Sequence, residues 1–482
     1  MSIRELEPKL VWEIFDDITR VPRPSKKEGK IIAFLEDFAR AHGLEYRKDA
    51  IGNVVICKAA TAGYEDRPTV VLQSHMDMVC EKNSDVDFDF ENDPIATRIE
   101  DGWVKAEGTT LGADCGIGMA AALAVLVDDT IAHGAVEALF TVDEETGLTG
   151  AFELGEGMLN GKYLINLDSE DEGEIFIGCA GGIDTVARFR YTLEDAPGSY
   201  AYFRVDVSDL LGGHSGDDID KGRANSNKIV ARLLWEAMHS YEMRLSYFCG
   251  GNLRNAIPRE AYAVFGVPMH LKNDFVKRYE MFAEDVRAEY RHTEPNFEIT
   301  LNEISDVASV IDESTQTALV DALVGVPNGV ISMSAVVAGL VETSSNLASV
   351  KFEGDDEIVV TLSQRSSVES AKTYIMQSVE SVFALAGAEV THSDGYPGWA
   401  PDPESQLLET TVESYRRLFG VEPKVRAIHA GLECGLFLEK YPDLEMVSFG
   451  PTLRGVHSPD ERIEISTVTK FWALLLDVLI HI

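Results

Sequence analysis

The segment VVLQSHMDMVCEKN, residues 70–83, decides how the fold is interpreted. Its apolar run, residues 70–72, stops abruptly at polar residues that include His75 and Asp77. Residues i and i+2 of a β-strand point to the same side, so these two side chains can face one point in space. A strand that simply leaves the core and meets water would look the same here. The rest of the chain must distinguish these two interpretations.

Two more predicted strands end in acidic residues. The segment EALFTVDEE, residues 137–145, ends in Glu144 and Glu145, and KYLINLD, residues 162–168, ends in Asp168. Apolar residues at helical spacing predict helices that alternate with these strands; they cover residues 8–21, 28–43 and 116–129. This alternation predicts an α/β fold with a parallel or mixed sheet flanked by helices. In such sheets functional groups gather at the carboxyl ends of the strands.

The length and charge of the chain limit its organisation and partners. At 482 residues it exceeds the usual size of one domain, so we expect at least two. Acidic residues outnumber basic ones 81 to 42, and the formal net charge is −39. Such a charge argues against nucleic acid or an anionic membrane as a partner. The charges are scattered, so no acidic tail is expected.

The cysteines and the N-terminal segment indicate a cytoplasmic protein. The six cysteines include no closely spaced pair such as C-x-x-C. The first residues, MSIRELEPKLVWEIF, lack the apolar core of a signal peptide, and no apolar run is long enough to cross a bilayer. We therefore expect a reducing cytoplasm with free thiols.

The pattern of predicted elements changes at about residue 186. Residues 202–304 read as strand, helix, strand, strand, helix, strand, which is a split βαβ arrangement typical of an α+β domain. Residues 348–394 read as a second, partial copy, although only the element order supports a duplication. A Gly- and Pro-rich boundary at 394–405 precedes a return to α/β character. We expect one α/β domain in two parts, residues 1–185 and 396–482, with a second domain inserted at 186–395.

Several metal-binding side chains stand out from the chain. They are His75, Asp114 in GTTLGADCGIG, the pair Glu144 and Glu145, Asp168, and His457 in LRGVHSPDE. Imidazole nitrogen and carboxylate oxygen suit Zn²⁺ without any thiolate. Each residue alone has a simpler explanation: a helix N-cap for Asp114, an exposed acidic turn for the glutamates, a strand-end turn for Asp168 and a loop position for His457.

The ordered set of motifs resembles the family of two-zinc exopeptidases and deacylases that includes carboxypeptidase G, aminoacylase, carnosinase and bacterial dipeptidases. The motifs that carry this resemblance are SHMDMV, GADCGIGMA, DEETGLTGA, NLDSEDEG, GGHSGDDI, GLECGLF and GVHSPDE, and they span nearly the whole chain. They look most like the dipeptidase branch. The resemblance implies a two-zinc exopeptidase-like catalytic domain with an inserted lid domain.

The resemblance also implies a role for each metal-binding residue. His75 and Asp168 would bind one zinc ion, Glu145 and His457 the other, and Asp114 would bridge them. Mn²⁺ or Co²⁺ could substitute for the two Zn²⁺ ions of each chain. A bridging carboxylate reduces the repulsion between dications about 3.5–4 Å apart. Asp77 would orient His75 through its second ring nitrogen. In relatives the peptide bond after the bridging aspartate is cis, so we expect a cis bond between Asp114 and Cys115.

The catalytic and substrate-binding roles follow from the same resemblance. Glu144 would be the general base, and His214 in LGGHSGDD would stabilise the developing oxyanion. Asn255 and Arg365 would contact the substrate carboxylate, and Glu433 the substrate ammonium. The simpler interpretations are a turn residue for Asn255 and surface residues for Arg365 and Glu433.

The expected activity is metal-dependent hydrolysis of unblocked dipeptides, including Xaa-His dipeptides such as carnosine. The first alternative is a two-zinc deacylase of N-acyl amino acids. A non-catalytic protein that binds metal or peptide would have lost Glu144 or a metal ligand, and all of these are present. A homodimer through the lid domain stays open, as does the question of whether His214 serves its own chain or a partner's.

Overall fold

The computed structural model describes residues 2–354 and 356–482 and divides into two units. Unit 1 consists of Met1–Gly178, Pro401–Ala427 and Leu432–Ile482, and unit 2 of Cys179–Ala400 and Ile428–Gly431. The expected domain limits at residues 186 and 395 stay predictions.

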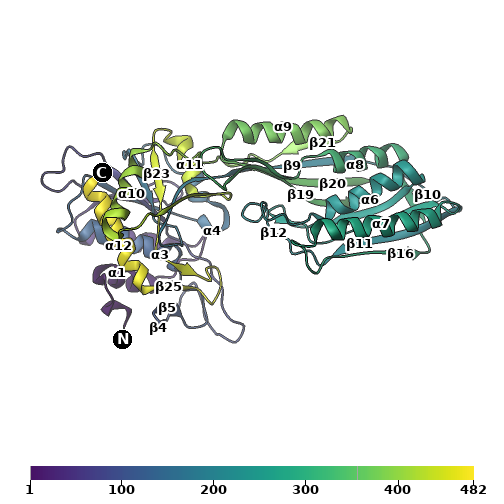
Figure 1. The fold of residues 1–482 in the computed structure, drawn as a ribbon. Coiled ribbons are helices and arrows are strands. Elements are labelled where there is room, and N and C mark those ends of the chain that lie inside the picture. Colours follow the sequence, from purple (N-terminus) through teal and green to yellow (C-terminus); the bar gives the residue numbers. More distant parts are fainter. Residues whose placement is uncertain (1, 355) are drawn as a thin grey trace. The chain divides into compact units, whose positions relative to one another are not determined.

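Unit 1 is built around an eight-stranded mixed sheet (Figure 1). In spatial order its strands are β1 (Glu45–Lys48), β2 (Val54–Lys58), β6 (Val136–Thr141), β3 (Val70–His75), β7 (Tyr163–Asn166), β23 (Glu445–Ser448), β8 (Glu174–Cys179) and β22 (Lys424–Ile428). The four central strands β6, β3, β7 and β23 run parallel, whereas β1–β2, β2–β6 and β23–β8 are antiparallel pairs. The predicted α/β class with a mixed sheet is confirmed.

Helices cover the central strands of this sheet, which explains their apolar sequences. Every residue of β3, β6 and β7 is buried, as expected for parallel strands with both faces covered. Helix α3 (Ala113–Val127) packs on β3 and β6 and against α1 (Lys9–Thr19), and α10 (Gln406–Phe419) packs on β23 and against α12 (Ile465–His481). The remaining helices of unit 1 are η1 (Ile3–Glu5), α2 (Gly29–Ala41), α4 (Glu144–Gly147), α5 (Thr149–Phe152) and α11 (Glu433–Lys440).

The register of the parallel strands brings their carboxyl ends to one edge of the sheet. His75 of β3 lies beside Thr141 of β6, and Gln73 of β3 lies beside Asn166 of β7. The loops that follow these three strands therefore begin next to one another. The strand expected at residues 137–145 is wrong at its end, because β6 stops at Thr141 and Glu144 begins the one-turn helix α4. The left-handed backbone of Asp143, with φ of 49°, turns the chain there.

A four-stranded sheet frames the remaining part of this edge. Its spatial order is β24 (Leu453–Arg454), β25 (Arg462–Glu464), β5 (Trp103–Ala106) and β4 (Thr97–Glu100). The loop between β24 and β25 carries His457, and the segment after β5 leads to Asp114. Residues more than 340 positions apart in the sequence thus approach each other through one small sheet.

Unit 2 contains a nine-stranded sheet in which every described pairing is antiparallel. In spatial order its strands are β16 (Glu298–Ile304), β11 (Tyr200–Ser208), β15 (Ala261–Pro268), β13 (Arg244–Gly250), β19 (Val341–Glu353), β20 (Glu357–Ser366), β9 (Gly181–Arg190) and β21 (Glu389–His392), and β18 (Gly329–Met333) pairs with β19. Two short ribbons, β10 (Leu193–Asp195) with β17 (Ser309–Ile311) and β12 (Gly213–His214) with β14 (Ala256–Ile257), accompany it.

The sheet of unit 2 contains one strand order twice. The first set is β11, β13, β15 and β16, and the second is β9, β19, β20 and β21. In each set the fourth strand pairs with the first, the first with the third, and the third with the second. Helices α6 (Ser226–Tyr241) and α7 (Lys272–Tyr290) occupy the same sequence positions in the first set as α8 (Glu313–Gly325) and α9 (Glu369–Leu385) in the second. The two sets join where β13 pairs with β19.

The helices of unit 2 pack on the sheet and form its core. Residues of β11 alternate between buried and half-buried, and the buried ones join a single apolar cluster with side chains of α6, α7, α8 and α9. Figure 1 shows these four helices lying along the sheet.

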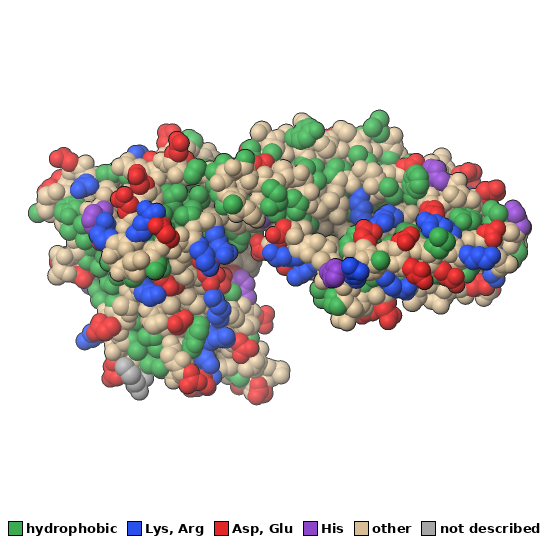
Figure 2. Space-filling view, in the orientation of Figure 1, with side chains coloured by type: hydrophobic (Ala, Val, Ile, Leu, Met, Phe, Trp, Pro, Cys, Tyr) green, Lys and Arg blue, Asp and Glu red, His purple; other side chains and the backbone are tan. Residues whose placement is uncertain are grey.

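Figure 2 shows Asp and Glu side chains scattered over the visible face among Lys and Arg. Within the described residues, no helix is both long and apolar enough to span a membrane.

Candidate metal centre

Asp114 lies between the two histidines predicted to bind metal. Its Oδ1 is 3.1 Å from Nε2 of His75, and its Oδ2 is 3.2 Å from Nε2 of His457. Each carboxylate oxygen thus faces a different imidazole. This is the arrangement that a carboxylate shared by two metal ions requires.

The other two predicted ligands complete one group on each side of Asp114. Asp168 Oδ1 is 3.4 Å from His75 Nε2, and Glu145 Oε2 is 3.0 Å from His457 Nε2. Ligand atoms about 2.0–2.2 Å from one zinc ion are separated by roughly 3–3.5 Å, so both groups have a suitable spacing. Asp168 Oδ1 and Glu145 Oε1 are buried and accept no hydrogen bond from the described residues. Buried carboxylate oxygens without a donor fit a cation site.

The five residues come from five separate segments of unit 1. His75 is the last residue of β3, Asp168 follows β7, and Glu145 lies on α4 just after β6. Asp114 lies at the start of α3, where its backbone is not helical, and the peptide bond to Cys115 is cis, as predicted. His457 has a left-handed backbone, with φ of 61°, in the loop between β24 and β25.

Asp77 connects the histidine at the end of β3 with the glutamate pair after β6. Its fully buried carboxylate lies 3.3 Å from His75 Nδ1. It also accepts hydrogen bonds from the Ser25 hydroxyl at 2.7 Å and from the backbone N–H groups of Glu144 and Glu145, at 3.1 and 3.3 Å. The strand therefore ends in His-x-Asp because Asp77 can orient both His75 and the turn that carries the two glutamates.

The protonation behaviour of these residues reflects their proximity. Burial alone would lower the pKa of His75, but the carboxylates of Asp168, Asp114 and Asp77 raise it well above its usual value. Hydrogen bonds to Asp114 and Glu145 raise the pKa of His457 to about 11. Burial raises the pKa of Asp168 to about 6. Metal binding requires these histidines to be deprotonated.

Glu144 differs from its neighbour Glu145 in its surroundings. Burial raises the pKa of Glu144 well above the usual value, and the nearby charges of Asp168 and Glu433 act in the same direction. Its backbone N–H is fixed by Asp77. A carboxylate with a raised pKa is a stronger base, so this group suits proton transfer better than an ordinary surface glutamate does.

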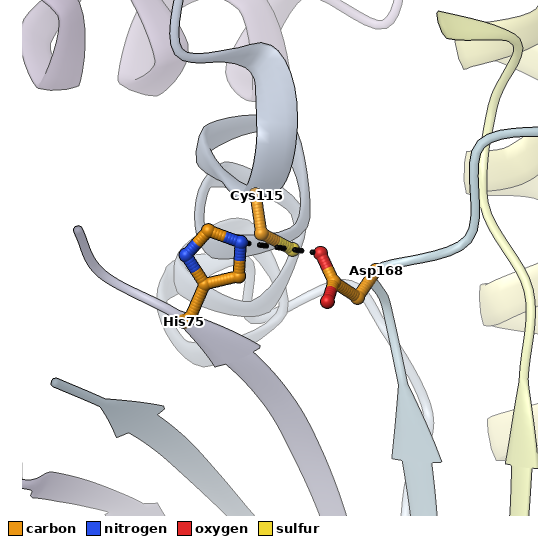
Figure 3. A group of neighbouring side chains, drawn as sticks. All are labelled: His75, Cys115 and Asp168. Atoms are coloured by element: carbon orange, nitrogen blue, oxygen red, sulfur yellow. Dashed lines mark ion pairs between the residues drawn. The ribbon is translucent and has the colours of Figure 1, made fainter. Parts of the chain in front are cut away.

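Cys115 is a potential ligand that sequence reasoning missed. One donor atom from each of His75, Cys115 and Asp168 lies within 4.8 Å of the others. Figure 3 shows the three side chains converging, with the ion pair between His75 and Asp168 dashed. The thiol donates a hydrogen bond to the carbonyl of Leu167 at 3.4 Å. The sequence signal that could have identified Cys115 was its position directly after Asp114.

A further group of buried carboxylates lies behind the metal-binding residues. Glu28, Asp77 and Asp143 offer oxygens within 4.8 Å of one another. Glu28 accepts hydrogen bonds from the N–H groups of Lys26 at 2.8 Å and Asp143 at 3.0 Å. Asp77 accepts backbone hydrogen bonds as well, whereas the Asp143 carboxylate accepts hydrogen bonds from the Thr146 and Thr149 hydroxyls. All three carboxylates therefore have donors and brace the turn before Glu144. Nothing in the sequence around Glu28 distinguished it from a surface residue.

Glu433, the predicted ammonium-binding residue, is buried at the start of α11. Its Oε2 accepts hydrogen bonds from Gln73 at 2.6 Å and Thr141 at 2.9 Å, both on the central strands. Its other oxygen is buried and accepts no hydrogen bond from the described residues. Burial raises its pKa to about 8. Ammonium binding by Glu433 stays a prediction.

The remaining predicted residues lie together in unit 2. Asn255 and Arg365 line one cavity of about 590 Å³, where Arg365 donates a hydrogen bond to the Tyr396 hydroxyl at 2.8 Å. His214 is on β12, and the adjacent Ser215 N–H donates to the Asn255 carbonyl at 2.9 Å. Tyr396 was missed by sequence reasoning, since a tyrosine in a Gly- and Pro-rich loop carries no distinctive signal.

Two known proteins resemble this chain over nearly its whole length. The cytosol non-specific dipeptidase of Escherichia coli (strain K12) is 42% identical over 479 residues, covering 99% of this chain and 98% of the relative. The crystal structure of aminoacylhistidine dipeptidase from Vibrio alginolyticus matches with a TM-score of 0.96 at 42% identity, covering 100% and 98% of the two chains.

A more distant structure shares the fold alone. The aminopeptidase PepT of Bacillus cereus ATCC 10987 has a TM-score of 0.57 at 17% identity and covers 98% of each chain.

The sequence profile of peptidase family M20/M25/M40 matches residues 71–481, which include all five predicted metal ligands. With this match and the near full-length likeness to the Escherichia coli dipeptidase, the chain belongs to peptidase family M20/M25/M40.

Proposed function

We propose that this chain is a metal-dependent dipeptidase that hydrolyses unblocked dipeptides, including Xaa-His dipeptides. The names of the two relatives at 42% identity, a cytosol non-specific dipeptidase and an aminoacylhistidine dipeptidase, support this substrate class. The Escherichia coli relative is named for the cytosol, and we propose the same compartment for this chain.

One observation carries the proposal. The two oxygens of Asp114 face two different histidines at 3.1 and 3.2 Å, and each histidine has a second carboxylate beside it. A site for a single metal ion needs no such symmetrical pair of groups. The arrangement supports two metal ions that share one carboxylate.

The proposed metals are two Zn²⁺ ions, with Mn²⁺ or Co²⁺ as substitutes. His75 and Asp168 would hold one ion, Glu145 and His457 the other, and Asp114 both. The nitrogen and oxygen donor set fits Zn²⁺, and five protein ligands leave positions open for water and substrate. Bound there, the two ions would supply Lewis acidity, which lowers the pKa of a water molecule and polarises the scissile carbonyl.

Glu144 is the proposed general base. Its carboxylate takes a proton from the attacking water molecule and later delivers that proton to the nitrogen of the leaving amine. Asp77 holds the Glu144 N–H and orients His75, so it positions the base and one metal ligand together. Glu144 therefore acts on protons, whereas Glu145 binds metal.

The proposed substrate contacts come from unit 2, except Glu433, which lies in unit 1. Arg365 suits the substrate carboxylate, because its planar guanidinium can bind both oxygens, and Asn255 lines the same cavity. His214 is the proposed donor to the oxyanion that develops on the scissile carbonyl. Glu433 is the proposed partner of the substrate ammonium. Recognition of both charged ends would restrict the enzyme to short, unblocked peptides.

The test is hydrolysis of a substrate panel by protein loaded with a defined metal. Dipeptides, tripeptides and N-acyl amino acids are assayed with Zn²⁺, Mn²⁺ or Co²⁺. We expect dipeptides to be cut and N-acetyl amino acids to be poor substrates. Glu433→Ala should impair dipeptide cleavage most. Cleavage of N-acyl amino acids without cleavage of dipeptides would instead identify a deacylase.

A further inference from the structure

One buried carboxylate outside the proposed ligand set binds the whole loop that ends in Asp114. Glu461 is 2% exposed, and it accepts four hydrogen bonds from consecutive backbone N–H groups. Its Oε2 is 2.7 Å from Leu111 N and 2.9 Å from Gly112 N, and its Oε1 is 2.7 Å from Ala113 N and 3.3 Å from Asp114 N. Successive N–H groups that converge on one anion hold it firmly.

A buried arginine binds the same loop through its carbonyl side. Arg23 is 1% exposed and donates to the carbonyls of Met76 at 3.1 Å and Asp77 at 2.6 Å through Nη1, and to the carbonyl of Gly112 through Nη2. A Cβ at Gly112 would lie 2.5 Å from this Nη2, so the loop has no room to move toward Arg23. Arg23 thus joins the end of β3 to the Asp114 loop, and Glu461 holds the loop's N–H groups.

Glu461 also fixes the segment that carries His457. It lies four residues after His457, and its own N–H donates to the Ser458 carbonyl at 3.0 Å. The Ser458 hydroxyl donates to the Gly455 carbonyl at 2.6 Å, which closes the turn around His457. The turn from Gly455 to Glu461 is therefore attached to the Asp114 loop by the Glu461 carboxylate. The 3.2 Å spacing between His457 Nε2 and Asp114 Oδ2 depends on this attachment.

We propose that Glu461 is a positioning residue for the metal pair: it orients Asp114 between the two ions and sets the affinity of the ion held by His457 and Glu145. This inference rests on the proposed two-metal function. Partners that orient metal ligands commonly change metal affinity by about 10–100-fold when they are mutated. The ion held by His75 and Asp168 should be affected less, because His75 is oriented by Asp77 and Arg23 from the end of β3.

The experiment measures metal binding in Glu461→Gln, which keeps the shape of the side chain but places an amide N–H₂ against backbone donors. Zn²⁺ affinity is measured for both ions by competition with a chelator, and dipeptide hydrolysis is measured at rising Zn²⁺ concentration. We expect the second ion to bind about 10–100-fold more weakly. Excess Zn²⁺ should restore much of the lost hydrolysis, because Glu461 touches neither the substrate nor the reacting atoms.

Glu137→Gln is the matched control. Glu137 is 4% exposed and accepts hydrogen bonds from the N–H groups of Asn160 at 2.8 Å and Gly161 at 3.1 Å, at the amino end of β6. Its substitution should lower the free energy of unfolding of the metal-free protein and leave both Zn²⁺ affinities unchanged. Loss of stability is thereby separated from loss of metal positioning.

The titration of Glu461→Gln distinguishes a positioning role of Glu461 from a merely structural one. If Glu461→Gln binds both ions like wild type and loses only stability, as the control does, Glu461 is merely structural and the inference is wrong. If Glu461→Gln does not fold, the same titration of Glu461→Asp, which keeps the charge on a shorter side chain, decides between these results. A wild-type protein that binds fewer than two ions would overturn the proposed function, and the inference with it.

Discussion

Asp77 and Glu144 illustrate how neighbouring carboxylates in one site can take different tasks. Asp77 is fully buried and its oxygens bind His75, Ser25 and two backbone N–H groups. The contact with His75 lowers the pKa of Asp77 to about 2 in spite of burial. Burial instead raises the pKa of Glu144. One carboxylate is thus kept ionised to hold its partners, while the other can exchange a proton.

Replacement of Glu144 tests its assignment to proton transfer. Glu144→Ala should keep two metal ions per chain and lose about 10²–10⁴-fold in turnover, the usual contribution of general acid–base catalysis. Metal content is measured by elemental analysis beside kcat for a dipeptide. Glu145→Ala is the matched variant and should lose one ion. If Glu144→Ala also loses metal, the roles of the two glutamates have been assigned the wrong way round.

The position of Cys115 makes the composition of the ligand set testable. The thiol donates to the Leu167 carbonyl, and burial raises its pKa well above the usual value. We therefore expect it to stay protonated and outside the ligand set. The absorption spectrum of Co²⁺-loaded protein should lack an intense near-ultraviolet sulfur-to-cobalt band and should match that of Cys115→Ser. An intense band that disappears in Cys115→Ser would make Cys115 a ligand.

At the scale of elements, strands β3, β6 and β7 could be predicted because their apolar runs end where ligands begin. The residues after β3, β6 and β7 gather because parallel strands in register place their carboxyl ends at one edge. Their convergence with Asp114 and His457 could not be derived from periodicity. It depends on a small sheet whose strands are only two to four residues long.

The residues that support the metal ligands could not be predicted from the sequence, for a physical reason. In a sequence, a buried Glu461 or Arg23 looks the same as an exposed one, since charged residues are usually at the surface. Their burial becomes apparent only when distant backbone groups bind them.

His429 gives unit 2 a predicted dependence on pH. Its ring is 5% exposed and lies 2.7 Å from the Ser344 hydroxyl, and burial lowers its pKa to about 4. At pH values between this folded pKa and the unfolded pKa of about 6.5, His429 binds a proton in the unfolded chain but not in the folded chain. Stability is therefore present above pH 6.5 and falls as the pH is lowered. We expect a loss of about 2 kcal/mol between pH 7 and pH 5.

Urea unfolding at the two pH values measures this loss. His429→Gln removes the titrating group and should reduce the dependence of the free energy of unfolding on pH. His239→Gln is the control, because His239 is exposed on α6 of the same unit and should leave the dependence unchanged. Equal pH dependence in wild type and His429→Gln would show that His429 is not the group responsible.

At the scale of the whole molecule, the repeated strand order in unit 2 bears on how His214 acts. The two sets of four strands lie in one chain and join through β13 and β19. If the second set takes the place of a lid that another subunit would supply, a single chain contains all the proposed catalytic groups. We therefore predict that His214 serves its own chain, whether or not the protein forms a homodimer.

Subunit mixing tests this prediction. Inactive His214→Ala protein is combined with inactive Glu144→Ala protein under conditions that exchange subunits. Action within one chain predicts that no activity returns. Donation across a dimer would restore activity to about a quarter of wild type, because half of the dimers would be mixed and each would have one competent site. That recovery would show the prediction to be wrong.

The most direct test of the account is the metal content and dipeptide hydrolysis of one zinc-saturated sample, with wild type beside Asp114→Ala. We expect two Zn²⁺ ions per wild-type chain and dipeptide hydrolysis that is lost when they are removed. Asp114→Ala should hold fewer ions and be inactive, because both groups depend on this carboxylate. Full hydrolysis by Asp114→Ala, or by wild-type protein stripped of metal, would contradict the account.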